Sequence, residues 1–382
     1  MGFNTTHRCG SDCDVSSCNL GFFERFFLFY GTIPEVRFMK KRVFCSFLSL
    51  TLLVAPPAWG QTTIIKRQAA KKAETSSSKL GIVKKDGLLY EVAPWNNYVA
   101  LVQDYNEKAP SLKGKITIPE YITYANRNYP VKCISRSFPN EVSSIFVPAQ
   151  VENIYGLIYG SPWVHWEEIE VDSRNPYFSS WGNALFNKQM TELLRVGKVN
   201  DFEIPSSVTK ISDHAFKFSQ MKSVTIPFSV NVIGREAFYC CYSLVQISVP
   251  SSVKAIGNET FYGDSALVEV TLPKTIEEFG YNVFRGCSKL KSLILPKGIK
   301  QIKGYDFANC QSLIEIFIPN GVTKIAYYSF YECRNLEKVS IPADLLDGIE
   351  KGAFSFCDKL VSISVRYPDG TTKDIAIRNE WK

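Results

Sequence analysis

A unit that recurs every 23 residues constrains this chain of 382 residues more than any other feature. Each unit places a proline directly after Ile, Val or Leu, and a phenylalanine follows 11 residues later, or 12 in the last unit. A turn of chain this short cannot bury its own apolar face, so successive units must stack and share one core. We therefore predict a right-handed, β-rich solenoid. The prolines are Pro205, Pro227, Pro250, Pro273, Pro296, Pro319 and Pro342, and the phenylalanines are Phe216, Phe238, Phe261, Phe284, Phe307, Phe330 and Phe354.

The residues before each proline predict the role of each position in a turn. Residues 290–295 carry the spacing L-x-x-L-x-L, which is typical of a leucine-rich-repeat strand. Side chains alternate along a strand, so Leu293 and Leu295 should point inward and Ile294 outward. The proline that follows has no N–H to give to the ladder and ends the strand. The fold prediction is a leucine-rich-repeat solenoid of 23-residue repeats, with short helical or 3-10 turns.

Cysteines recur three residues after the phenylalanine in five of the seven units. Disulfides between neighbouring turns are one interpretation for an exported protein, because stacked turns lie close enough for bonding. Three observations favour buried free thiols instead: the in-register spacing, the fit of small thiols to buried positions, and an odd total of seven after residue 60. The recurring cysteines are Cys241, Cys287, Cys310, Cys333 and Cys357, and the other two are Cys133 and Cys240.

Residues 39–60 have the pattern of a secretory signal peptide. A basic start is followed by the apolar run 43–55 and by the small-x-small site Ala58–Gly60. The apolar run is too short to span a bilayer. We expect cleavage near Gly60-Gln61 and a secreted, cell-surface or periplasmic chain without a transmembrane segment. The residues before this leader are interpreted as an upstream extension that is not native; a small metal motif using His7 and nearby cysteines is the alternative.

The pattern of strands, turns and polar stretches predicts six segments. Two hairpins are expected, at 87–103 and within 183–196, and a closing strand at 372–377. Atypical end turns are expected because they must shield the core and block edge pairing. The segments are 1–38, the upstream extension; 39–60, the signal peptide; 61–79, a flexible linker; 80–203, an N-terminal cap and divergent repeats with a hairpin insertion; 204–365, the regular repeats; and 366–382, a C-terminal cap.

Composition and motifs argue against nucleic-acid binding and catalysis. The formal net charge of +7 is modest and dispersed, without the basic patch that a nucleic-acid partner requires. His165 and His214 are far apart in sequence, and no nucleophile elbow, phosphate loop or metalloprotease motif stands in a supporting context. We expect no enzyme activity, no cofactor and no metal.

The repeat resembles that of the BspA-type leucine-rich-repeat proteins of bacterial surfaces. The pattern apolar-Pro-x-x-Val-x-x-Ile-x-x-x-x-Phe-x-x-Cys-x-x-Leu is matched from Pro319 to Leu336, and residues 175–188 resemble an insertion common in that group. The resemblance covers about 80–382 and is strongest within 204–365. It implies an exported or surface-exposed protein, often from host-associated bacteria such as Bacteroidetes, with a role in adhesion. It supplies no catalytic residue.

The candidate binding residues are those where the repeat varies. Most outward positions of the strands are small and polar, but Ile294 and Phe317 are adjacent apolar exceptions, flanked by Glu269 and Glu315. This set is a candidate hot spot for a partner. Ordinary β-propensity on an exposed face is the alternative. A second candidate is the aromatic stretch that contains Tyr159 and Trp163.

The sequence therefore predicts an exported, adhesin-like binding protein that engages a protein or glycan, of host or bacterial origin, through the solenoid face. A structural component of the bacterial envelope without a soluble ligand is the alternative. We expect a monomer, because the stacked units complete their own core.

Overall fold

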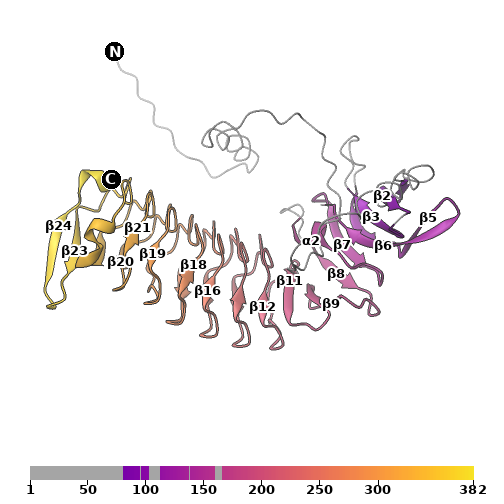
Figure 1. Cartoon of the computed structure of the whole chain (residues 1–382), viewed down its shortest axis with the longest axis horizontal. Helices are drawn as coiled ribbons and strands as arrows, with labels where there is room; N and C mark the ends of the chain where they lie inside the picture. Colours follow the sequence, from indigo (N-terminus) through magenta and orange to yellow (C-terminus); the bar gives the residue numbers. More distant parts are fainter. Residues whose placement is uncertain (1–80, 95, 103–111, 137, 160–165) are drawn as a thin grey trace, which may run out of the picture. The chain divides into compact units, whose positions relative to one another are not determined.

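The computed structural model describes residues 81–94, 96–102, 112–136, 138–159 and 166–382, all within the unit Ala58–Lys382. The predicted upstream extension, signal peptide and linker lie outside the described residues, as do Trp163 and His165. In the described part, strands from successive turns of the chain pair side by side, most of them in parallel (Figure 1). The predicted leucine-rich-repeat solenoid is confirmed.

The described part begins with a five-stranded sheet in the order β1-β2-β3-β6-β5. The predicted hairpin is present as β2 and β3, which pair antiparallel. The sequence analysis missed β1, which pairs antiparallel with β2 on its other edge. β3 pairs in parallel with β6, so the first crossover of the stack is made here. The strands are β1 (Gly81–Lys85), β2 (Leu88–Ala93), β3 (Tyr98–Val102), β5 (Tyr121–Tyr124) and β6 (Arg127–Ile134).

The divergent turns that follow form a parallel three-stranded sheet in the order β4-β7-β8. A single turn of helix, α2 (Tyr155–Ile158), lies between β7 and β8 in the chain. Phe138 and Trp166 meet edge to face in the core of this part, with ring centroids 5.5 Å apart. The strands are β4 (Gly114–Thr117), β7 (Val142–Val147) and β8 (Glu168–Val171).

The segment 175–199 was expected to interrupt the array, and it contains the predicted hairpin. β10 and β11 pair antiparallel, with β9 on the other edge of β10. β11 then pairs in parallel with the first short strand of the regular turns, so the hairpin continues the ladder at its N-terminal side. The strands are β9 (Phe178–Trp181), β10 (Ala184–Asn187) and β11 (Glu192–Val196).

Most regular turns contribute one strand to a first parallel ladder, which is divided into the sheets β13-β15-β17 and β20-β22-β23-β24. The middle residue of each three-residue strand is buried and its neighbours point to solvent, as the inward and outward assignment predicts. Between β17 and β20 the turn keeps a single bridge, from Ile294 to Phe317. We call the outward side of this ladder the strand face. The strands are β13 (Ser223–Thr225), β15 (Gln246–Ser248), β17 (Glu269–Thr271), β20 (Glu315–Phe317), β22 (Lys338–Pro342) and β23 (Ser362–Arg366).

A second parallel ladder consists of two-residue strands that follow the first six prolines, and it is interrupted between β18 and β19. The second residue of each strand is buried and is Ile, or Phe in one turn. These residues are the Ile positions of the repeat, which re-enter the core after the proline. The strands are β12 (Lys210–Ile211), β14 (Val232–Ile233), β16 (Ala255–Ile256), β18 (Glu278–Phe279), β19 (Gln301–Ile302) and β21 (Lys324–Ile325).

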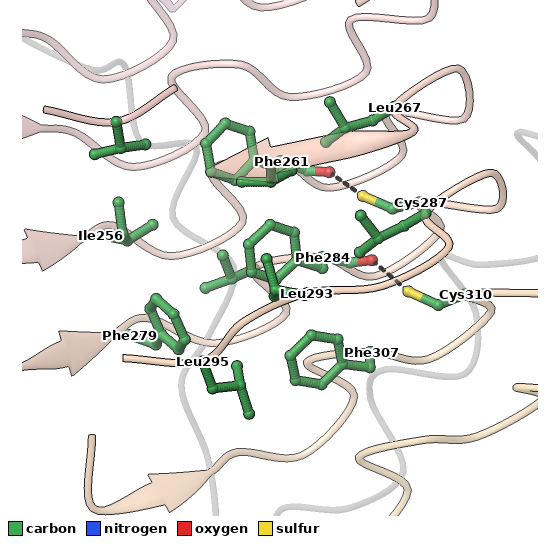
Figure 2. Close-up of a cluster of buried hydrophobic side chains, with 14 of the residues drawn as sticks. Ile256, Phe261, Leu267, Phe279, Phe284, Cys287, Leu293, Leu295, Phe307 and Cys310 are labelled. Atoms are coloured by element: carbon green, nitrogen blue, oxygen red, sulfur yellow. Dashed lines mark hydrogen bonds between the residues drawn. The ribbon is translucent and has the colours of Figure 1, made fainter. Parts of the chain in front are cut away.

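The phenylalanines form a third column, inside the turns. All seven rings are buried and neighbours stack nearly parallel, for example Phe307 on Phe330 with centroids 5.2 Å apart and 7° between planes. Figure 2 shows three of these rings beside the buried leucines of the same turns. Backbone N–H groups here donate to the next turn, as from Phe238 to the carbonyl of Thr260 at 3.0 Å. The stack therefore has hydrogen bonds on three sides.

This third side is a run of turns, as the spacing of the phenylalanine predicts. The residues two before and two after each phenylalanine are left-handed, with φ between 52° and 80°. A left-handed residue costs roughly 1–2 kcal/mol unless it is glycine, and the hydrogen bonds to the next turn offset that cost. Helical segments among the described residues are α2, η1 (Ala343–Gly348) and η2 (Asn379–Trp381). The left-handed residues before the ring are His214, Glu236, Glu259, Asn282, Tyr305, Tyr328 and Gly352, and those after it are Phe218, Cys240, Gly263, Gly286, Asn309, Glu332 and Phe356.

The seven cysteines of the described part are free and buried, in agreement with the free-thiol prediction. In the repeat, each thiol donates to the carbonyl of the phenylalanine of the preceding turn. Figure 2 shows two of these bonds, from Cys287 to Phe261 at 3.1 Å and from Cys310 to Phe284 at 3.2 Å. Burial raises the pKa of Cys287 and of Cys310, which keeps both thiols protonated as donors.

The C-terminal cap closes the stack with the predicted last strand. β24 (Thr372–Ala376) pairs antiparallel with β23 and so covers the edge of the first ladder. The sequence analysis did not identify Trp381, which is buried and whose carbonyl accepts the N–H of Phe354 at 2.7 Å. Trp381 thus takes the place that the next turn would occupy beside the last phenylalanine.

Candidate binding surface

Ile294 and Phe317 lie next to each other on the strand face. A parallel bridge joins their backbones, and their side chains are 87% and 55% exposed. Thr271, on one side of Ile294 in the same column, is exposed and polar. The predicted apolar pair is therefore brought together by the stack, one turn apart, on a face whose other members are mostly small and polar.

A cation at the end of β23 holds Phe317 in place. The guanidinium carbon of Arg366 lies 3.7 Å from the centre of the Phe317 ring. The same guanidinium donates to the hydroxyl of Ser340 at 2.7 Å and to the carbonyl of Ile318 at 2.6 Å. A ring fixed in this way loses little conformational entropy when a partner covers it. Arg366 was not among the predicted site residues, because it is 49 residues from Phe317 in the chain.

Glu269 and Glu315 flank this pair in the neighbouring outward column. Both carboxylates are exposed, at the first positions of β17 and β20. In the register of the ladder Glu269 lies beside Gln246, and Glu315 lies beside Lys338. The candidate site is thus an apolar centre with acidic and basic groups at its rim, an arrangement that is typical of protein-binding patches.

Tyr159 lies elsewhere, beside the first regular turn. Its ring is 43% exposed and contacts the rings of Tyr155 and His214, with centroids 4.7 and 5.0 Å away. Burial of part of the ring raises the pKa of Tyr159. The structure therefore separates Tyr159 from the Ile294–Phe317 pair by several turns.

A band of aromatic residues on the outside of the phenylalanine turns was missed by the sequence analysis. Tyr239 and Tyr262 stack with centroids 4.8 Å apart and 3° between planes. Lys217 lies over the outer face of Tyr239 at 4.4 Å, and Arg285 lies over both Tyr262 at 5.6 Å and Tyr305 at 4.8 Å. The signal was present, since Tyr239 and Tyr262 are 23 residues apart. Because the rings and cations cover one another's faces, this band stabilises neighbouring turns.

His214 belongs to a buried ion cluster with no catalytic geometry. Burial, and then the charge of Lys217, lowers the pKa of His214 to about 4, so the imidazole is neutral at pH 7. Glu236 pairs with both Lys217 and Arg235, and these cations hold the pKa of its carboxyl low although burial opposes this. Over the residues that the structure describes, no group of His, Cys, Asp or Glu side chains is arranged to hold a metal ion. The cluster binds its own charges together.

Comparison with known proteins connects these features to a repeat family. Residues 194–304 and 278–376 match, in six copies, the family model of the BspA type leucine rich repeat region. A leucine-rich repeat protein from Eubacterium ventriosum is 21% identical, with a TM-score of 0.54 over 71% of this chain and 93% of that one. This likeness supports the fold. No curated protein matches the chain.

Two further solved structures are similar at lower scores. A leucine rich cell surface protein from Faecalibacterium prausnitzii is 17% identical, with a TM-score of 0.39 over 80% of this chain and 98% of that one. The pneumococcal vaccine antigen PcpA is 17% identical, with a TM-score of 0.42 over 71% of this chain and 96% of that one. As for the membrane, none of the helices in the described ranges is long and apolar enough to cross one.

Proposed function

We propose that this chain, whose regular turns are BspA-type leucine-rich repeats, is an exported, adhesin-like protein that holds a protein or glycan partner on its strand face. The observation that carries the proposal is the exposed pair of Ile294 and Phe317 on an otherwise polar ladder, with Arg366 packed on the ring. Binding, and not catalysis, is the activity that a face of this composition supports.

The physical basis is the removal of this pair from water. Covering an exposed Ile or Phe side chain contributes roughly 1.5–3 kcal/mol each. Glu269 and Glu315 at the rim would select a partner with basic groups and speed its association. The rigid ladder beneath them requires no reorganisation on binding, so most of this free energy is available to the complex.

Export is the part of the proposal that depends on the leader, residues 39–60. Its basic start, apolar run and small-residue site support cleavage near Gly60-Gln61 and a location on the cell surface or in the medium. N-terminal sequencing of the protein made by its natural host tests this. A mature chain that begins at Gln61 is expected, and one that retains residues 1–38 would contradict it.

The binding experiment compares the apolar pair with a matched control. Partners are first identified by applying the wild-type protein to arrays of extracellular-matrix proteins and of glycans. The variant Ile294→Ser/Phe317→Ser should then bind at least tenfold more weakly, because a loss of about 1.4 kcal/mol corresponds to a factor of ten in Kd. The control is Phe228→Ser, which removes a ring that is 78% exposed between the two ladders.

The two variants separate a binding surface from ordinary exposed residues. Both should fold, since all three side chains are exposed, and the double variant should lower Tm by no more than a few degrees because it loses only the contact of Arg366 with the Phe317 ring. If the double variant binds as tightly as the wild type, the strand-face proposal is wrong. Tyr159 is proposed as a separate contact, and Tyr159→Ser tests it in the same assay.

A further inference from the structure

One buried charge in the described part has no partner. Arg195, on β11, is 5% exposed and makes a single hydrogen bond, from Nη1 to the carbonyl of His214 at 3.0 Å. Its Nε is buried without a partner, and no carboxylate of the described residues pairs with it. Burial lowers the pKa of Arg195 to about 10, so the group is still charged at pH 7. An unpaired buried guanidinium is strongly destabilising unless an anion compensates it.

Arg195 lines a small pocket where the divergent turns meet the first regular turn. The other lining residues include the cations Lys198 and Lys217, the donors Ser219 and Gln220, and Trp166, while none of the described lining residues is acidic. The ammonium groups of both lysines also have carboxylate partners, Glu167 at 3.8 Å for Lys198 and Glu236 for Lys217. Arg195 is therefore the charge in this pocket that remains uncompensated.

Hydrogen bonds hold one wall of the pocket together. The carbonyl of Trp166 accepts the N–H of Lys198 at 2.6 Å and the side-chain amide of Asn183 at 3.0 Å. The cavity has a volume of about 10 Å³, which is the lower limit for one water molecule. It admits a single oxygen of a larger group, and a halide ion, which is larger than water, fits when the exposed side chain of Lys198 moves outward.

We propose that this pocket is an anion site that takes a halide ion, or one oxygen of a carboxylate or sulfate, against the guanidinium of Arg195. The bound charge compensates the buried cation and joins residues of the divergent turns to the first regular turn. The site is independent of the strand face and requires no partner protein.

Bromide is a direct probe because it replaces chloride and scatters X-rays anomalously. Crystals of the full-length protein grown in sodium bromide should show an anomalous peak in the pocket, within contact distance of Arg195. If bromide peaks appear on exposed lysines alone, the proposal is overturned.

Thermal unfolding tests the energetic role. Titration of the wild type with sodium chloride should raise Tm saturably by about 2–4 °C beyond the general effect of salt, which Arg195→Met measures at the same ionic strength. Arg195→Met keeps an apolar stem and should lose this rise, whereas Lys289→Met, on an exposed lysine of a later turn, should keep it. An equal chloride response in Arg195→Met and the wild type would refute the site.

A second variant and two other anions extend the unfolding experiment. If Arg195→Met does not fold, Lys198→Met removes a charge at the pocket mouth and should raise the chloride concentration needed for half of the Tm shift several-fold. Titrations with acetate and sulfate distinguish the source of the negative charge. A larger shift with acetate or sulfate than with chloride identifies an oxyanion group as the ligand, and a larger shift with chloride identifies the free halide.

Discussion

Asp264 occupies the position that five turns give to a buried thiol, and replacing it with cysteine should stabilise the protein. Its side chain is fully buried. One carboxyl oxygen accepts the N–H of Cys241 at 2.7 Å, but the other has no partner. Burial raises the pKa of Asp264 well above its usual value, although the bond from Cys241 opposes this. Asp264 thus places a carboxyl group with one unsatisfied oxygen at a buried position where the other turns place a thiol.

The expected gain in unfolding free energy of Asp264→Cys has two contributions. An unsatisfied buried oxygen costs about 1–3 kcal/mol, and the thiol of Asp264→Cys removes that cost. In its place the thiol should donate to the carbonyl of Phe238, as the other thiols do to the preceding phenylalanine, and its sulfur should accept the N–H of Cys241, as Cys310 does from Cys287. The variant should therefore gain about 1–3 kcal/mol in unfolding free energy even when the carboxyl is protonated.

The second contribution depends on pH. Because the pKa is higher in the folded state, the folded protein holds a proton that the unfolded chain releases, so wild-type stability falls as pH rises above the unfolded value of 3.8. Each unit of pH between the two pKa values lowers the unfolding free energy by about 1.4 kcal/mol. The advantage of Asp264→Cys should therefore increase from pH 4 to pH 8.

Urea unfolding of the wild type and the variant at pH 4, 6 and 8 measures both contributions. Asp306→Asn is the control, since Asp306 is also buried, with a pKa raised to about 7, but its carboxylate accepts the N–H of Lys303 at 2.8 Å. That variant should lose only the part of the pH dependence that Asp306 contributes, without a comparable gain at pH 4. If Asp264→Cys is no more stable than the wild type at pH 8, the account of this column is wrong.

Three other predictions concern the core and its ions. Phe307→Ala should lower the unfolding free energy by about 3–5 kcal/mol because it leaves a cavity between stacked rings, whereas Phe356→Ala, on an exposed ring, should change it by less than about 1 kcal/mol in the same urea experiment. A thiol reagent should label none of the seven cysteines of the described part in the native protein and all of them after denaturation without reductant; fewer labelled thiols would indicate disulfides. His214→Gln should reduce the loss of stability between pH 6.5 and 4, because the imidazole has a lowered pKa when folded and the unfolded chain takes up the proton; an unchanged pH profile would contradict this.

The sequence predicts the buried part of the fold well for a physical reason. Leu293, Leu295 and Phe307 must each fill the same space as their counterparts one turn away, so their types recur and can be read from the spacing. The strand face follows from the same pattern, because Ile294 alternates with the inward leucines. The candidate pair of Ile294 and Phe317 could therefore be predicted as adjacent and exposed before any coordinates were known.

The left-handed residues of the phenylalanine turns leave no periodic signal in the sequence, because the backbone and not the side chain determines their conformation. The left-handed residue before each phenylalanine is Glu236 in one turn, Asn282 in another and Tyr328 in a third. Side-chain type cannot predict this conformation, since stacking hydrogen bonds between turns impose it. The packing of Arg366 on Phe317 and the closure by Trp381 depend on contacts across several turns, which local spacing does not contain.

A residue that departs from the repeat changes folding stability by an amount that depends on whether its side chain points to solvent or into the core. Ile294 replaces a small polar residue on the outer side, where an apolar side chain changes stability little and becomes available to a partner. Asp264 and Arg195 place charges in the buried part, where an ionisable group without a partner lowers stability. An inward departure therefore requires a compensating group, and the stack supplies only the N–H of Cys241 to one and the carbonyl of His214 to the other. By this reasoning a proton neutralises the buried carboxyl of Asp264, and a bound anion neutralises the buried guanidinium of Arg195.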